Sequence, residues 1–496
     1  MNNLLVLPLL IPLGTAILLL FLNRRVSAQR WVSMTGLLGT AASSCLIVSQ
    51  VHSQGIQVLR MGGWLPPYGI VFVADMLGAL LVLTTSVVGA ACLWYAFGTI
   101  GSEREKHYFY PLTQFLLAGI NGSFLTGDLF NLFVCFEVLL IASYALIVLG
   151  GTRRQLRETL KYMLINILSS TLFVAAVAYL YGVVGTLNMA DLSHKVAEVG
   201  QYGILQVIAV LFLIVFSLKS GLFLFFWLPG SYAAPPPAVA ALFAALLTKV
   251  GVYALLRTST LLFVAEPVAI QGWIHGLAAV TMVLGSLGAV AYRDIRLILN
   301  YNVVVSVGFI ALGLAVSSRE ALDGAVFYLI HDMVAKALLF ILGGWIAGTA
   351  GTYDIKEMGG LMKRYPLQGW LFFAAVLAIA GIPPFSGFAG KLLLIQGGLR
   401  EGYYGLTAVA LASSLIVLYS LIRVFMHAFW GERKPLPPMP NTRPVSRMTV
   451  VLPAAGLGLL VIGMGLGSEF VYRLVAEAGQ TLADSAAYID AVLRKE

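Results

Sequence analysis

The feature that most constrains the fold is a series of long apolar runs that recur along almost the whole chain of 496 residues. A helix needs about 20 apolar residues to cross the hydrocarbon core of a bilayer. Only 11% of the residues are charged, whereas a soluble domain typically carries about 25%. We therefore expect an all-α membrane protein with about fourteen transmembrane helices, near residues 4–22, 31–50, 72–98, 108–126, 129–149, 159–184, 205–228, 237–262, 271–292, 297–316, 322–348, 370–396, 405–428 and 448–467.

Basic residues in the connecting loops predict the orientation of the chain. Seventeen lysines and arginines lie in the odd-numbered loops, and five, including Arg257, lie in the even-numbered loops or at the edges beside them. Because cytoplasmic loops are enriched in these residues, we expect the odd loops in the cytoplasm and both termini outside. The first run lacks a basic start and a small-residue cleavage site, which favours a retained helix over a signal peptide. The longest connection, residues 431–447, is expected to be a basic, proline-rich cytoplasmic linker.

The remaining polar residues argue against several classes of function. The net charge of +9 comes from short loops between apolar runs, so topology explains it and we expect no nucleic-acid partner. Cys45, Cys92 and Cys135 lie inside apolar runs at spacings that suit neither a disulfide framework nor a metal cluster. No nucleophile, metal or cofactor motif occurs in the sequence. We therefore expect a protein that is not an enzyme and that holds no metal or cofactor.

An internal repeat appears when the sequence is shifted by 166 residues. The matching pairs under this one ungapped offset include Tyr162 with Tyr328, Asp128 with Asp294, and Ser220-Gly221 with Ser386-Gly387. The unit spans five helices, the fourth to eighth (108–262) against the ninth to thirteenth (271–428). Helices 1–3 precede it (1–107), and helix 14 and the tail follow (429–496). Since five is odd, the second copy enters the membrane from the opposite side, which predicts the inverted repeat of many ion-coupled transporters.

Two of the predicted helices are expected to be interrupted at related positions. Pro383 and Pro384 in the twelfth helix remove two amide donors, so a regular helix cannot persist there. Ser220 and Gly221 lie at the equivalent place in the seventh. Backbone groups freed at such breaks tolerate burial only where protein, water or ions satisfy them. The pair of breaks indicates a hydrated path, with packing kinks that have no role in transport as the alternative.

Titratable residues lie inside the apolar runs, several of them beside the breaks. A charge at the centre of a membrane helix costs roughly 2.5–3.5 kcal/mol on insertion scales, so it usually has a partner or a function. Lysine suits proton transfer because burial lowers a lysine pKa and a neighbouring carboxylate raises it again. We expect Glu137 and Lys219 to form such a pair. The predicted proton pathway is Glu137, Lys219, Lys249, His331, Lys336 and Lys391.

Other charged residues leave more than one interpretation open. Any single member of the row could be explained by an interhelical ion pair or by a lysine that snorkels to the interface. Asp332 could tune its neighbour His331 or face another helix, and the sequence does not decide between the two. Asp75 and Asp128 lie near helix ends, where we expect a solvated or capping role.

Five motifs in order carry a family resemblance that covers roughly residues 1–470. They are "GDLFNLFVCFEVLLIASYAL", "FSLKSGLFLFFWLPGSYAAPPPAVAALFAALLTKVGVYAL", "YRDIRLILNYNVVVSVGFI", "HDMVAKALLF" and "GIPPFSGFAGK". The chain resembles the antiporter-like, proton-translocating membrane subunits shared by respiratory complex I and the multisubunit Mrp-type cation/proton antiporters. Within that family it is most similar to the D-type Mrp subunits. Complex I relatives usually carry Asp-Ala-His where this chain has Gly230-Ser231-Tyr232.

The resemblance implies a role for each residue of the row. Glu137 and Lys219 match the coupled acid and base of the family, Lys249 its central lysine, His331 its eleventh-helix histidine and Lys391 its twelfth-helix terminal group. Lys336 matches a recurrent lysine. By analogy, protons enter near Lys219 and pass along Lys249 and His331 with waters to Lys391. The row is asymmetric under the repeat, because Glu137 maps onto Val303 and Lys391 lies six residues beyond the counterpart of Lys219.

The resemblance also implies the biological setting. We expect a multi-pass subunit of the bacterial plasma membrane, working in a hetero-oligomer of A to G type subunits that exchanges internal Na+ for external H+ and supports alkaline pH homeostasis. One alternative is a complex I-like pump subunit coupled to quinone reduction. Another is a scaffold that holds neighbouring subunits while the ion path lies elsewhere.

Overall fold

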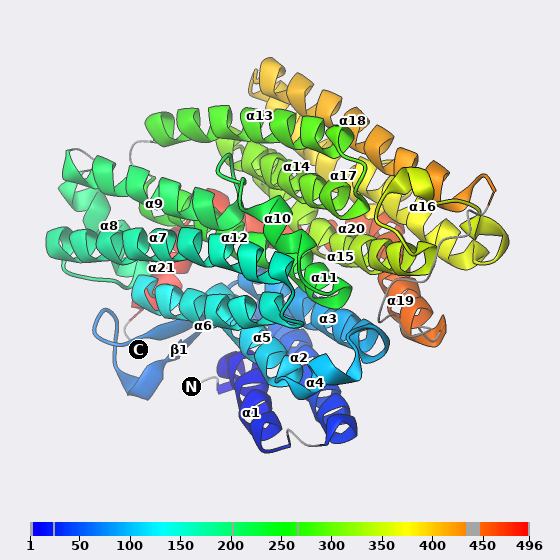
Figure 1. The fold of residues 1–496 in the computed structure, drawn as a ribbon. Helices are drawn as coiled ribbons and strands as arrows, with labels where there is room; N and C mark the ends of the chain where they lie inside the picture. The colour runs from blue at the N-terminus through cyan, green and yellow to red at the C-terminus, as the bar shows by residue number, and fades with distance from the viewer. Residues whose placement is uncertain (1–2, 23–24, 201–202, 265–266, 433–446, 495–496) are drawn as a thin grey trace.

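The computed structural model describes residues 3–22, 25–200, 203–264, 267–432 and 447–494, and this part of the chain is almost entirely helical (Figure 1). Most of the predicted linker at 431–447 lies outside the described residues. The N-terminal elements are η1 (Asn3–Val6), α1 (Leu7–Phe21), α2 (Val26–Gln54), β1 (Gln57–Arg60), η2 (Met61–Gly63), β2 (Val71–Ala74), α3 (Met76–Thr99) and α4 (Ser102–Lys106). Strands β1 and β2 form an antiparallel hairpin.

The two repeats follow, and then a C-terminal segment. The first repeat contains α5 (Phe109–Leu125), α6 (Leu129–Val148), α7 (Arg153–Val184), α8 (Met189–Val199), α9 (Ile204–Ser220), α10 (Leu228–Ala233), α11 (Pro237–Leu242), η3 (Phe243–Leu247), α12 (Thr248–Arg257) and η4 (Thr258–Leu262). The second contains α13 (Pro267–Ala291), α14 (Ile295–Val316), α15 (Arg319–Ala350), η5 (Ile355–Glu357), η6 (Leu361–Lys363), α16 (Pro366–Ala380), α17 (Ser386–Arg400) and α18 (Tyr404–Phe429). The chain ends with α19 (Arg447–Leu466), α20 (Ser468–Ala483) and α21 (Ala486–Leu493).

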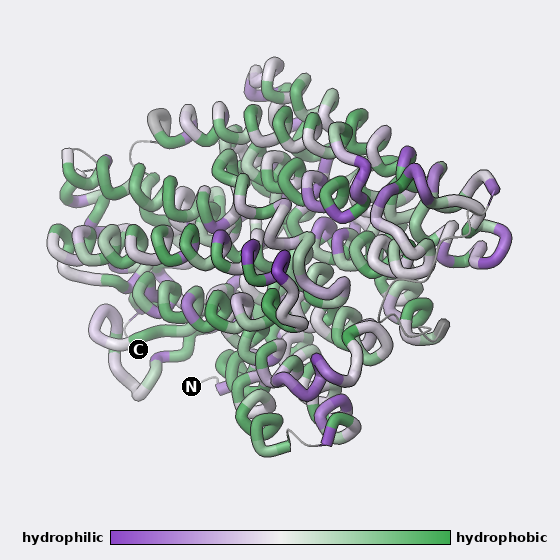
Figure 2. The backbone as a smooth tube through the Cα atoms, in the orientation of Figure 1, coloured by the Kyte–Doolittle hydropathy of each residue, from purple (hydrophilic) through white to green (hydrophobic). Residues whose placement is uncertain are grey.

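Each of the fourteen predicted runs lies on helical structure, although two are split. Among the described residues, eleven helices are long and apolar enough to cross a membrane, and α9 and α16 are shorter apolar helices. Hydrophobic residues run along most helices, and hydrophilic segments gather mainly where helices end (Figure 2). The described residues near both ends of the chain meet at β1, which packs on η1 and whose Arg60 donates to the carbonyl of Arg494. The all-α membrane fold is confirmed, whereas the orientation of the termini stays a prediction.

Backbone contacts reproduce the offset of 166 residues. An isolated bridge pairs Asp128 with Asn188, and its equivalent pairs Asp294 with Asp354. Each of these aspartates caps the helix that follows it, Asp128 on α6 and Asp294 on α14. The capping role expected for Asp128 is therefore confirmed. Two segments that share a register and their long-range contacts are two copies of one structural unit, which supports the repeat, whereas its inversion across the membrane stays a prediction.

Both predicted helix breaks are present, but they lie in different registers. In the first repeat α9 ends at Ser220, where Gly221 takes a left-handed conformation with φ of 77°. In the second repeat α16 ends at Ala380, Gly381 has φ of 84°, and α17 begins at Ser386. The Ser-Gly pair therefore closes a helix in one copy and opens one in the other.

A buried ion pair corrects two sequence-based expectations. Arg257 was counted beside a loop, yet it lies in α12 with only 3% of its side chain exposed and donates to the Asp75 carboxylate at 2.7 Å. Asp75 caps α3 by accepting from the amide of Gly78, but its side chain is fully buried rather than solvated. The guanidinium also lies 4.9 Å from the ring centre of Tyr488 in α21. This pair thus ties the N-terminal helices to the first repeat and to the C-terminal segment.

Helices α20 and α21 were not predicted, because they are amphipathic and shorter than a membrane span. Asp323 of α15 accepts hydrogen bonds from Arg319 at 3.1 Å and from Tyr472 of α20 at 3.2 Å. His52 of α2 contacts Glu477 of α20 at 2.7 Å. The segment therefore joins the N-terminal helices to the second repeat through polar contacts.

Arg257→Ala should destabilise the fold by roughly 3–5 kcal/mol, because it leaves the Asp75 carboxylate buried without a cation. The measurement is the thermal unfolding midpoint in detergent. Arg473→Ala is the matched control, since Arg473 is 73% exposed in its pair with Glu469 and should contribute less than about 1 kcal/mol. Equal midpoints for the two variants would contradict a structural role for the buried pair.

A row of buried charges at the helix breaks

Glu137 and Lys219 are brought together through a serine. Lys219, in the last turn of α9, is 5% exposed and donates to the Ser170 hydroxyl of α7 at 3.2 Å. Ser170 in turn donates a short hydrogen bond to Glu137 of α6, which is half-buried. Lys219 also lies 4.9 Å from the ring centre of Phe136. The predicted acid and base are therefore linked by hydrogen bonds through one hydroxyl, and the described residues show no direct ion pair between them.

The centre of the row is a triad of two lysines and one carboxylate. Lys249 of α12 lies 2.7 Å and Lys336 lies 3.5 Å from the carboxylate of Asp332 on α15, and all three side chains have no exposed surface. Asp332 thus faces Lys249 on another helix, which decides the question that the sequence left open. Burying ions costs several kcal/mol each unless geometry compensates them. One carboxylate here balances two ammonium groups.

Backbone carbonyls complete the coordination of both central lysines. Lys249 donates to the carbonyl of Ala244 at 2.8 Å, within the π-helical turn η3 that precedes α12. Lys336 donates to the carbonyl of Asn302 in α14 at 3.0 Å. A π-turn shifts the helical hydrogen-bond register and occurs frequently at functional sites. The irregularity in the eighth helix therefore lies at the charge that the sequence placed there.

His331 connects the central triad to the second helix break. Its Nδ1 lies 2.7 Å from the hydroxyl of Ser386, the first residue of α17, and the side chain is fully buried. Its ring centre is 5.6 Å from that of Tyr328. His331 Nε2 has no hydrogen-bond partner among the described residues. The imidazole can therefore accept or donate a proton at Nε2 while Ser386 orients Nδ1.

Lys391 lies on α17 but binds the end of α16. Its ammonium donates to the carbonyls of Ile379 at 2.9 Å and Ala380 at 3.1 Å, and to the Ser414 hydroxyl at 2.6 Å. The carbonyl end of a helix carries a partial negative charge that favours cations. Lys219 lies in the last turn of α9, at the corresponding end of the other interrupted helix. The two lysines differ in sequence register, yet both sit at the carbonyl end of a broken helix.

The helices that carry Lys219 and Lys249 pack closely against each other. No hydrogen bond or ion pair between described residues joins the two lysines, although α9 and α12 pack so closely that a β-carbon at Gly251 would meet the amide nitrogen of Ser220 at 2.5 Å. The buried hydroxyls of Ser217 and Thr248, next to these lysines in sequence, have no partner in the described part of the chain. Buried polar atoms are normally hydrogen-bonded, often by ordered water. A proton that passes between the two lysines therefore needs a bridging group, and these two hydroxyls are candidates to bind one.

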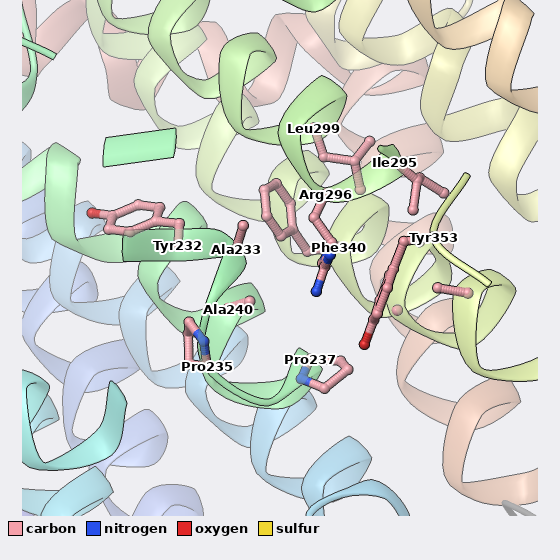
Figure 3. Close-up of a pocket in the computed structure, with 13 residues that line it drawn as sticks. Tyr232, Ala233, Pro235, Pro237, Ala240, Ile295, Arg296, Leu299, Phe340 and Tyr353 are labelled. Atoms are coloured by element: carbon pink, nitrogen blue, oxygen red, sulfur yellow. The ribbon is translucent and has the colours of Figure 1, made fainter. Parts of the chain in front are cut away.

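A pocket lies one helical turn beyond Lys336. Its lining includes Tyr232, Arg296, Phe340 and Tyr353, which come from α10, α14, α15 and the segment after α15. Arg296 and Tyr353 lie side by side at the pocket in Figure 3, with the guanidinium carbon 3.3 Å from the ring centre. Phe340, which lines the pocket, is four residues and so about one helical turn from Lys336 on α15. The pocket is a candidate aqueous approach to the row.

The structure thus gives each of the six predicted pathway residues polar contacts. Glu137 and Lys219 share Ser170, and Lys249 and Lys336 share Asp332. His331 and Lys391 each contact an end of the second interrupted helix. Sequence reasoning missed Ser170 and the bridging role of Asp332. The signal for Ser170 was present, because it lies on a face of α7 whose buried positions are polar at helical spacing. The arrangement gathers four buried lysines, a histidine and two carboxylates, which suits the relay of protons.

Comparison with known proteins identifies related chains. Residues 126–417 match the family model described as NADH:quinone oxidoreductase/Mrp antiporter, TM. The chain is 49% identical, over the full length of both, to the D-type subunit of the Na(+)/H(+) antiporter of Bacillus subtilis (strain 168). It superposes with a TM-score of 0.91 and 30% identity on a chain of the Mrp complex from Dietzia sp. DQ12-45-1b, covering 99% of this chain and all of that one. A chain of respiratory complex I from Thermus thermophilus with bound NADH gives 0.82 and 25%, covering 98% and 99%.

Asp332→Asn should reduce stability by roughly 3–5 kcal/mol, because it leaves two buried ammonium groups without an anion. The double variant Asp332→Asn/Lys336→Met should recover part of this loss, since one uncompensated charge is removed. Thermal unfolding of the purified protein in detergent measures both. A double variant no more stable than the single one would show that the triad does not carry the electrostatic balance described here.

Proposed function

Since the chain belongs to the NADH:quinone oxidoreductase/Mrp antiporter family of membrane subunits, we propose that it is the proton-translocating D-type subunit of a hetero-oligomeric Na+/H+ antiporter. Its full-length identity to the D-type subunit of an Na(+)/H(+) antiporter supports the transported ions. Its superposition on a chain of an Mrp complex supports other membrane subunits as its partners. The assembly lies in a bacterial plasma membrane.

The observation that carries the proposal is the buried row from Glu137 to Lys391. Each titratable group in it contacts another member, a hydroxyl or a freed carbonyl, and His331 and Lys391 contact the second broken helix directly. A row placed only for packing would not require a carboxylate shared by two fully buried lysines, because an apolar replacement is often as stable as a buried ion pair. Transport supplies a reason to keep these charges.

Proton transfer begins, in this mechanism, at the pair joined by Ser170. Ionised Glu137 stabilises the ammonium of Lys219 through the serine hydroxyl. When Glu137 is neutralised or moves away, that stabilisation is lost and Lys219 releases its proton toward Lys249 by way of water. Ser170 therefore transmits the charge state of Glu137 to Lys219.

The second half of the path begins at the triad. A positive charge that arrives beside Lys249 weakens the hold of Asp332 on Lys336, because one carboxylate now faces more positive charge. Lys336 then releases its proton to His331, whose Nε2 has no partner in the described part of the chain. From His331 the proton passes to Lys391 at the end of α16. Water completes the steps between side chains that are not in contact.

The proton motive force drives the exchange. The assembly takes up external protons while coupled Na+ leaves the cell, which supports growth at alkaline pH. A complex I-like role coupled to quinone reduction is the second candidate, favoured by the superposition on a complex I chain, and copurifying redox subunits would establish it. A purely structural scaffold predicts instead that only substitutions that disturb assembly abolish transport.

Glu137→Ala and Lys219→Ala should each lower Na+-dependent proton exchange in everted vesicles by at least about tenfold, since each removes a group that the relay requires. Assembly of the complex must be checked by copurification of its subunits. Full antiport in both variants, with normal assembly, would refute proton conduction through this row.

Ser170→Ala should slow exchange by about fivefold, the effect of one lost hydrogen bond of about 1 kcal/mol, because water can replace the hydroxyl only in part. Ser169→Ala is the matched control. Ser169 is also buried on α7, but it donates to the carbonyl of Val215 and touches neither Glu137 nor Lys219 in the described structure. Equal rates for the two variants would mean that Ser170 does not link the acid to the base.

A further inference from the structure

The inner face of α7 is polar from the start of the helix to Ser170. Every residue that is buried between Arg153 and Ser170 is polar, whereas the exposed positions among them include Leu156, Leu160 and Leu164. The buried residues are Gln155, Glu158, Thr159, Tyr162, Asn166, Ser169 and Ser170. Their spacing of three or four residues places them in one stripe. This stripe runs from one membrane face to the pair formed by Glu137 and Lys219.

Glu158 is the charged residue of the stripe and lies near its outer end. Its side chain is 7% exposed, and Arg157 and Lys161, which are largely exposed, approach Oε1 at 2.8 and 3.6 Å. Oε2 accepts no hydrogen bond from the described residues and lies so close to α10 that a β-carbon at Gly230 would overlap it. The N-terminal part of α7 lies against α10 in Figure 1. One carboxylate oxygen is therefore held by surface cations while the other faces the interior.

Polar residues of the stripe lie between Glu158 and Ser170. Tyr162 and Asn166 divide the distance into three steps of four residues, each a rise of about 6 Å. One water with two hydrogen bonds of about 2.8 Å spans such a step. The Tyr162 hydroxyl accepts from Ser143 at 3.2 Å, which leaves its own proton available for donation. The buried Thr159 hydroxyl beside Glu158 has no partner among the described residues, as expected for a group that binds water.

We propose that Glu158 is the carboxylate that exchanges protons between the Lys219 end of the row and the aqueous face at which α7 begins, by way of the Tyr162 hydroxyl and of water hydrogen-bonded to Tyr162 and Asn166. This assignment rests on the proposed function. The step is a simple proton transfer, because the Glu158 carboxylate takes a proton from one side and returns it to the other, and water is the only co-reactant. Gly230 is required here, since a side chain at that position would displace the Glu158 carboxylate.

A purely structural ion pair between Glu158, Arg157 and Lys161 makes different predictions. These three residues lie within one turn of α7, and the two cations are 69% and 58% exposed, so the pair should contribute little to stability. A structural role also gives no reason for Tyr162, Asn166 and Ser170 to follow Glu158 on the same face. The relay accounts for the acid and for the stripe together.

The test is Na+/H+ exchange in everted vesicles that contain the complete assembly with Glu158→Gln. We expect the maximal rate to fall by roughly tenfold or more, with an unchanged KM for Na+ and normal copurification of subunits, and Glu158→Asp to restore most of the rate. Tyr162→Phe should show a smaller loss in the same direction. Glu103→Gln and Tyr179→Phe, both exposed residues, are the matched controls and should behave as wild type.

The outcomes separate the two proposals. Wild-type exchange in Glu158→Gln together with loss of exchange in Lys219→Ala overturns the role of Glu158 and leaves the proposed function intact. Wild-type exchange in Lys219→Ala overturns the proposed function. A raised KM for Na+ in Glu158→Gln, with the maximal rate unchanged, would also overturn the role of Glu158, because a proton-exchanging group acts on turnover.

A second measurement does not depend on turnover. In a background without Cys45, Cys92 and Cys135, Glu158→Cys should react with a charged, membrane-impermeant maleimide added to the face at which α7 begins, whereas Leu164→Cys on the outer face of the helix should not. Equal labelling of the two positions, or labelling of Glu158→Cys only from the opposite face, would overturn the assignment of Glu158 to this aqueous face.

Discussion

The structure depends on the balance between two lysines and one carboxylate at the centre of the bundle. Lys249, Asp332 and Lys336 are fully buried, so their charges cannot be screened by water and must be compensated locally. The compensation is incomplete in number, because the triad holds two potential cations and one anion. Carbonyls of a π-turn and of α14 supply the remaining negative dipoles. A group of this kind is sensitive to any charge that arrives beside it, which is what a proton relay requires.

The helix breaks extend the same principle to the ends of the row. Lys219 lies in the last turn of α9, and Lys391 reaches back from α17 to the last carbonyls of α16. The Lys391 ammonium therefore uses the negative end of a half-helix in place of a carboxylate, whereas the Lys219 ammonium contacts the Ser170 hydroxyl that links it to Glu137. The repeat supplies two such ends, and the shift in register between the breaks explains why Lys391 does not align with Lys219 in sequence. Only the first half adds an acid, Glu137, which makes the two ends chemically different.

Much of the fold could be predicted because it follows from local patterns. The apolar runs, the offset of 166 residues and the proline and glycine positions each depend on residues close in sequence or on a simple repeat. The six residues of the predicted pathway could be named because each is a titratable group within a run of apolar residues. Arg257 was misplaced for the opposite reason, since its partner Asp75 is 182 residues away.

What the sequence could not provide was the partner of each charge. Asp332 lies close in sequence to both His331 and Lys336, and only the fold brings Lys249 within 2.7 Å of its carboxylate. Ser170 is an ordinary serine until the fold places it between an acid and a base. The polar inner face of α7 was available from helical periodicity alone, and counting which face is polar would have pointed to both Ser170 and Glu158.

The central claim is that the row from Glu137 to Lys391 conducts protons through water held between its charged groups. The most direct test is a structure of the assembled complex at a resolution that shows ordered water. The account predicts a hydrogen-bonded water chain that joins Lys219 to Lys249 and His331 to Lys391 in at least one conformer. A dry gap of many ångström between either pair in every conformer would contradict it.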